Sequence, residues 1–163
     1  MNADKVMRDQ LLALLRGGQA HLTFNQAVAE FPMEYINRRP PNVSYTPWHL
    51  LEHMRLAQWD ILEFIRNPDH VSPAWPEGYW PAPQAEADPA RWQQTLNRFQ
   101  SDLKALEELV ANPDTDLFSD IPHAPGYTIL REVLVVADHN AYHIGEFAIL
   151  RQVMNTWPAT RKS

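Results

Sequence analysis

The amino-acid sequence predicts an all-α fold, a four-helix bundle whose helices are joined by long irregular loops. Three observations predict it. Apolar residues recur at three- and four-residue intervals in four segments, prolines cluster between these segments, and no segment shows the apolar–polar alternation of a strand. The chain has 163 residues, a usual size for one domain. We therefore expect residues 1–163 to form a single domain.

The first predicted helix covers about residues 3–29. Its apolar positions are Leu11, Leu12, Leu14, Leu15, Leu22 and Phe24. The pair Gly17-Gly18 interrupts this segment, and each glycine costs about 1 kcal/mol relative to alanine in a helix. We therefore expect one helix that is kinked or split at the glycines.

The second predicted helix has a marked start and end. Thr46 suits the N-cap, and Pro47 suits the first helical position, where its missing N–H costs nothing. The apolar pattern continues to Ile65, and the helix is expected to end before Asn67-Pro68. The proline-rich segment that follows, residues 68–89, is also rich in aromatic residues, so we expect it to pack on the body of the protein.

The third and fourth helices are predicted in the same way. Asp88 and Pro89 repeat the cap-then-proline signal, and an amphipathic stripe follows as far as residue 111. Thr128 suits the N-cap of a fourth helix, which we expect to end near Asn155.

The composition excludes several classes of partner and site. The formal net charge is −6, and nothing larger than Arg38-Arg39 forms a basic cluster, so a nucleic-acid partner is not expected. No apolar run approaches the roughly 20 residues needed to span a membrane. The first ten residues lack the features of a secretory signal, so we expect a cytoplasmic location. The absence of cysteine excludes disulfides, thiolate metal sites and a cysteine nucleophile.

Four of the seven histidines form two pairs with a spacing of four residues, His49 with His53 and His139 with His143. Each pair lies in a predicted helix, where residues four apart share one face. Two such imidazoles can hold one metal ion, and a third from a neighbouring helix would complete the site. Without thiolates, the ion could be Zn²⁺, Ni²⁺, Mn²⁺ or Fe²⁺. A single helical pair is more often a surface or hydrogen-bonded feature, but two pairs on different helices favour a metal site.

The residues around both pairs resemble the DinB/YfiT-like superfamily. The resemblance rests on residues 137–146 (ADHNAYHIGE) with residues 150–152, and on residues 45–54 (YTPWHLLEHM) with residues 58–60. It implies a four-helix bundle, commonly a homodimer, with one divalent metal ion bound by three histidines. The family's ligands match His53, His139 and His143.

Further residues are candidates for the site. Glu146 could orient a ligand histidine or act as an acid or base, or it could be a surface ion-pair partner. His49 could contact substrate, lie behind the ligands or be a fourth ligand, or it could be a hydrogen-bonded residue at the helix start. His123 could border the mouth of the site, although a turn is the more common role. Trp75 and Trp80 could cover a substrate pocket, although tryptophans more often lie in a core or an interface.

Two functions are weighed. The first is a metal-dependent enzyme that acts on a small molecule, because an open three-histidine site can activate water for hydrolysis. The resemblance adds thiol-S-transferases that use a low-molecular-weight thiol of the bacillithiol, mycothiol or glutathione kind. The second is a non-catalytic, metal-stabilised bundle associated with stress. An exchangeable water beside a pocket would favour the first, and a closed sphere of four protein ligands the second.

Overall fold

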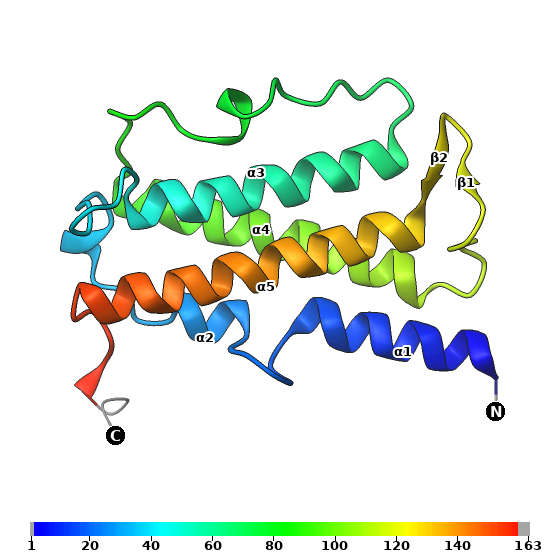
Figure 1. Cartoon of the computed structure of the whole chain (residues 1–163), viewed down its shortest axis with the longest axis horizontal. Coiled ribbons are helices and arrows are strands. Elements are labelled where there is room, and N and C mark those ends of the chain that lie inside the picture. The colour runs from blue at the N-terminus through cyan, green and yellow to red at the C-terminus, as the bar shows by residue number, and fades with distance from the viewer. Residues whose placement is uncertain (1, 160–163) are drawn as a thin grey trace.

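The computed structural model describes residues 2–159, and its helices pack side by side as a bundle (Figure 1). The helices in this part of the chain are α1 (Ala3–Arg16), α2 (Phe24–Val28), α3 (Pro47–Arg66), α4 (Pro89–Ala111) and α5 (Ile129–Val153). Short 3₁₀ helices cover Met33–Tyr35 and Glu77–Tyr79. The prediction of an all-α fold is confirmed.

The predicted first helix is two helices, α1 and α2. α1 ends at Arg16 because Gly17 and Gly18 have φ angles of 67° and 81°, in the region that favours glycine. A Cβ on Gly18 would lie 2.9 Å from Cγ2 of Thr23, so the turn itself needs a glycine. Thr23 then starts α2 with a capping box, in which its side chain and that of Gln26 each bind the other residue's backbone N–H. Of the two expected effects of Gly17-Gly18, a kink or a split, the structure has the split, and residues 17–23 between α1 and α2 are not helical.

The other helices begin where the sequence predicts. The side chains of Thr46, Asp88 and Thr128 accept hydrogen bonds from the backbone N–H groups three residues later, as N-caps do. α3 and α4 span the predicted residues, and α5 ends at Val153, two residues before the predicted end.

A small hairpin between α4 and α5 was not predicted. β1 (Asp120–Ile121) and β2 (Ala124–Thr128) pair antiparallel, with Asp120 opposite Thr128 and Ile121 opposite Ala124. The strands are too short for an alternating pattern, and two prolines and a glycine interrupt them.

The core forms between α3 and its neighbours α4 and α5. Trp48 of α3, Phe99 of α4 and Phe147 of α5 are almost completely buried in one cluster, and a second cluster continues toward the hairpin. The connection between α3 and α4 (residues 67–88) runs back along the outer side of α3 (Figure 1). None of the helices in residues 2–159 is long and apolar enough to cross a membrane.

Candidate metal centre

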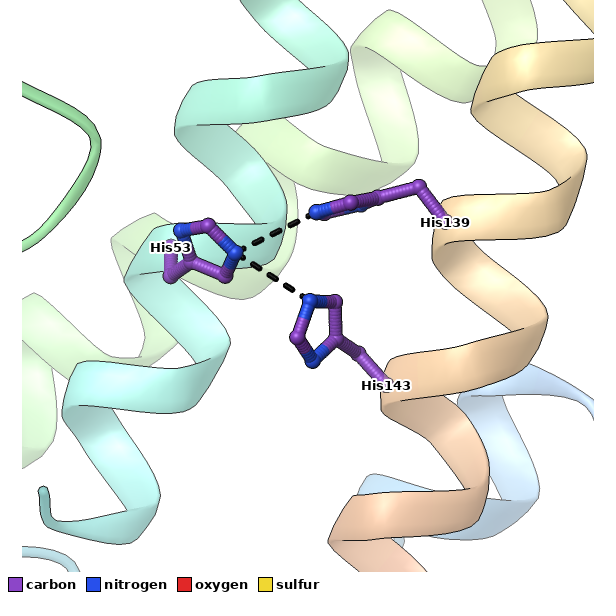
Figure 2. A group of neighbouring side chains, drawn as sticks. All are labelled: His53, His139 and His143. Carbon is purple, nitrogen blue, oxygen red and sulfur yellow. Dashed lines mark hydrogen bonds between the residues drawn. The ribbon is translucent and has the colours of Figure 1, made fainter. Parts of the chain in front are cut away.

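Three histidines meet where α3 and α5 face each other. His53 extends from α3, and His139 and His143 extend from successive turns of α5 (Figure 2). Nε2 of His53 lies 3.1 Å from Nε2 of His143 and 3.2 Å from Nε2 of His139. The ligand atoms that the three rings offer all lie within 4.8 Å of one another. The three residues therefore form one compact group that could hold a metal ion.

The hydrogen bonds of the outer ring nitrogens assign the tautomers of two of these rings. Nδ1 of His53 lies 2.9 Å from the backbone oxygen of Tyr79, and Nδ1 of His143 lies 2.6 Å from Oε2 of Glu146. Carbonyl and carboxylate oxygens only accept, so in each ring Nδ1 carries the proton. When the rings are neutral, Nε2 of His53 and Nε2 of His143 each present a lone pair, and neither carries a proton that could form a hydrogen bond to the other. A divalent cation would satisfy the lone pairs, so the donor set fits a metal ion.

The environment keeps two of the rings neutral. Burial, together with the neighbouring His143 and His53, lowers the pKa of His139 to about 3. Burial also lowers the pKa of His53, with His143 adding to this effect, while the hydrogen bond to Tyr79 opposes it. Neutral imidazole is the form that binds metals, so these rings need not lose a proton to act as ligands near pH 7.

Glu146 connects the trio to Tyr45. One carboxylate oxygen accepts from His143, and the other accepts a hydrogen bond from the Tyr45 hydroxyl. Burial alone would raise the pKa of Glu146, but the hydrogen bonds from His143 and Tyr45 lower it below its usual value. The carboxylate is thus charged and holds the His143 ring in place.

Tyr45 was not among the predicted site residues. It immediately precedes the N-cap Thr46, and only the packing of α3 on α5 brings it to Glu146. Burial, followed by the Glu146 carboxylate, raises the pKa of Tyr45, so its hydroxyl stays a donor.

The two tryptophan candidates lie in different surroundings. The Trp80 ring stacks on His53 with a centroid distance of 4.0 Å and an angle of 5°, and Tyr45 lies on Trp80 at 5.4 Å. Trp75 is 74% exposed, and its ring contacts Tyr79. Trp80 is therefore part of the wall of the site, whereas Trp75 is at the surface.

The other two histidine candidates are not in the trio. His49 is buried, and its Nε2 donates to the backbone oxygen of Ala85. His123 is exposed in the turn between β1 and β2, and its Nε2 donates to the backbone oxygen of Phe64. Phe64 lies 11 residues beyond His53 on α3, about 16 Å along the axis.

The fold and the site define a class of protein, an all-α bundle with a three-histidine group that could bind a metal. The family model described as the DinB superfamily matches residues 18–147, and the chain belongs to this family. No curated protein and no solved structure matches the chain.

Proposed function

We propose that the protein binds one divalent metal ion, Zn²⁺, Ni²⁺, Mn²⁺ or Fe²⁺, through His53, His139 and His143. The observation that carries this proposal is the convergence of three Nε2 atoms, two of which belong to rings whose Nδ1 atoms are already hydrogen-bonded. The Nε2 lone pairs of His53 and His143 lie 3.1 Å apart and repel each other when no cation lies between them, so the arrangement favours metal binding.

We further propose a metal-dependent enzyme of the thiol-S-transferase or hydrolase type that acts on a small molecule. A metal ion in this position supplies Lewis acidity, which lowers the pKa of a water or thiol that reaches it. The chain has no cysteine, so the nucleophile is water or an external low-molecular-weight thiol. Glu146 and Tyr45 orient His143, and Trp80 covers the face of His53.

The alternative is a non-catalytic, metal-stabilised bundle with four protein ligands. His49 and Glu146 are its candidates for the fourth ligand. His49 donates to Ala85, and both Glu146 oxygens accept hydrogen bonds. These partners favour the open three-histidine site and therefore the enzyme.

A homodimer is also proposed. The exposed face of α5 carries Val135, Tyr142 and Ile149, each seven residues from the next, and such a stripe is suited to packing against a second copy. A single domain over residues 1–163 and a cytoplasmic location stay predictions.

Metal content and a thiol-transfer screen test the function. The purified protein is expected to hold one divalent ion per chain, and His143→Ala is expected to lose both the ion and the activity. His123→Ala, which removes an exposed histidine outside the trio, is the control and should retain both. Full metal content in His143→Ala would exclude the proposed ligand set. If the metal-loaded protein neither transfers a thiol to electrophiles nor hydrolyses test esters and amides, the non-catalytic alternative is favoured.

A further inference from the structure

A second group of polar side chains is formed by Asp60 of α3 with His70 and Tyr79, and Tyr79 connects it to the metal centre. Asp60 is 7% exposed, and its two carboxylate oxygens accept hydrogen bonds of 2.6 Å from Nε2 of His70 and from the hydroxyl of Tyr79. Both donors belong to the α3–α4 connection. A buried carboxylate needs such donors, because leaving it without them would cost several kcal/mol. Asp60 therefore fixes this connection on the helix.

Tyr79 joins this group to the metal centre. Its hydroxyl binds Asp60, while its backbone oxygen accepts the Nδ1 proton of His53. The next residue, Trp80, stacks on the His53 ring. Asp60 and His53 are seven residues apart on α3, so they lie on the same face, and one short segment contacts both.

The segment that carries Tyr79 is itself tightly packed. A Cβ on Gly78 would lie 2.6 Å from Cβ of Pro73, and Gly78 N donates to the backbone oxygen of Ala74. Because the turn over residues 73–79 is compact, a shift of the Tyr79 ring at Asp60 also moves the carbonyl that holds His53.

We propose that Asp60 is a positioning residue of the metal centre. Through Tyr79, with His70 on its other oxygen, it fixes the segment of residues 70–80 so that the Tyr79 carbonyl and the Trp80 ring hold His53 with Nε2 toward the metal. Metal binding and docking of this segment are then coupled, and each stabilises the other. This inference rests on the proposed three-histidine site.

Tyr79→Phe is the principal variant, because it removes the hydroxyl that binds Asp60 and retains the ring and the backbone. Competition with a chromophoric chelator should show a Zn²⁺ affinity about 10-fold lower than that of the wild type, at the lower end of the effect of losing an outer partner of a ligand. Asp60→Asn, which retains one acceptor oxygen, should act in the same direction. Gly78→Ala should also weaken binding, because it displaces the segment without changing Asp60, Tyr79 or His53.

His123→Gln is the matched control. His123 also joins a loop to a backbone oxygen of α3, but at Phe64, far from the trio. The Zn²⁺ affinity of the His123→Gln variant should equal that of the wild type. Thermal unfolding of each metal-free variant shows whether a lower Zn²⁺ affinity results merely from a less stable fold.

Two further measurements test the positioning of His53 without relying on Zn²⁺ affinity. In the metal-free wild type, ¹⁵N NMR should show His53 with its proton on Nδ1, and Tyr79→Phe should shift it toward a mixture of tautomers. Hydrogen exchange of residues 70–80 should slow when Zn²⁺ is added to the wild type, and this effect should shrink in Tyr79→Phe.

The possible outcomes distinguish a failure of the proposed role of Asp60 from a failure of the proposed metal site. A Tyr79→Phe variant with wild-type Zn²⁺ affinity and wild-type exchange would overturn the role of Asp60 while leaving the metal site intact. A wild type that binds no Zn²⁺ would overturn the coupling to the metal, and the His53 tautomer in Tyr79→Phe would then decide whether Asp60 still orients the ring.

Discussion

Glu146 lies between Tyr45 and His143 and accepts a hydrogen bond from each. A carboxylate in this position fixes the orientation of the imidazole and raises its strength as a ligand. Neither oxygen is left without a donor, so the geometry favours an orienting role over that of a base. This distinction can be tested with substitutions that differ in whether they keep an acceptor.

Replacement of Glu146 by alanine is expected to weaken metal affinity about 10- to 100-fold, because His143 loses the partner of its Nδ1. Glu146→Gln keeps an amide oxygen for His143 and is expected to lose much less. Chelator competition with Zn²⁺ measures both variants. Equal losses in the two variants would show that charge, and not orientation, is what Glu146 contributes.

The low pKa of His139 predicts a pH dependence of stability in the metal-free protein. The pKa is lowered from 6.5 to about 3 by burial and then by its histidine neighbours, so between these pH values the unfolded chain binds a proton that the folded chain does not. The contribution of neutral His139 to the free energy of unfolding is therefore fully present above about pH 6.5. It falls as pH drops toward 3, by at most about 1.4 kcal/mol per pH unit.

Urea unfolding with a chelator at pH 7, 6 and 5 measures this slope. His139→Gln should have a shallower slope than the wild type, and the difference isolates the histidine from carboxylates that titrate in the same range. Parallel slopes for the two proteins would contradict the prediction.

At the scale of helices, a buried arginine joins α5 to the end of α2. The Arg151 guanidinium is fully buried and donates to the backbone oxygens of Ala27, Ala29 and Thr156. It also lies over the rings of Phe31 and Trp157. Arg151 satisfies carbonyls that the short helix α2 leaves open at its end, and so it holds α2 against α5.

Arg151→Met is expected to lower the free energy of unfolding by about 3 kcal/mol or more, because it leaves buried carbonyls without donors. Arg66→Met is the control, since Arg66 is half exposed and forms an ion pair with Glu63 in the same helix. That variant should change the free energy by less than about 1 kcal/mol. Urea unfolding measures the free energy of unfolding of both variants. Equal losses in Arg151→Met and Arg66→Met would contradict the proposed role of Arg151.

At the scale of the whole molecule, apolar side chains remain exposed along α5. Tyr142 is 71% exposed and Ile149 is 64% exposed, while other faces of the same helix carry buried core residues and the two histidines His139 and His143. One helix thus serves both the metal centre and the proposed dimer face.

Light scattering at micromolar concentration is expected to give the mass of a dimer. Ile149→Glu should shift the protein to the monomer, because in a two-fold interface it brings two buried like charges near each other. Val71→Glu changes an apolar residue that is 84% exposed in the α3–α4 connection, and it should leave the mass unchanged. A monomeric wild type would contradict the proposed dimer.

The helix starts were predictable from the sequence because they depend on residues within one turn of each other. Thr46, Asp88 and Thr128 each bind a backbone N–H three positions later, and no distant contact is needed. The spacing of the histidines likewise placed each pair on one helical face. Gly17-Gly18 predicted a kink or a split in the first helix, and the turn geometry decided for the split. The short hairpin escaped prediction, because pairing between its two strands decided it.

The surroundings of the metal centre depend on tertiary structure. His53 and His143 are 90 residues apart, and sequence spacing alone could not join them, although the family resemblance matched both. Glu146 meets His143 within one turn of α5, and the spacing of three residues already made it a candidate. The partner of His53, Tyr79, and the further contacts of Tyr45 and Asp60 follow from how α5 and the α3–α4 connection pack on α3. Local hydrogen bonds and periodicity decide which residues are helical and which faces they share. Only packing decides that the Tyr79 carbonyl meets His53 and that the Tyr45 hydroxyl meets Glu146, because these contacts join segments far apart in the chain.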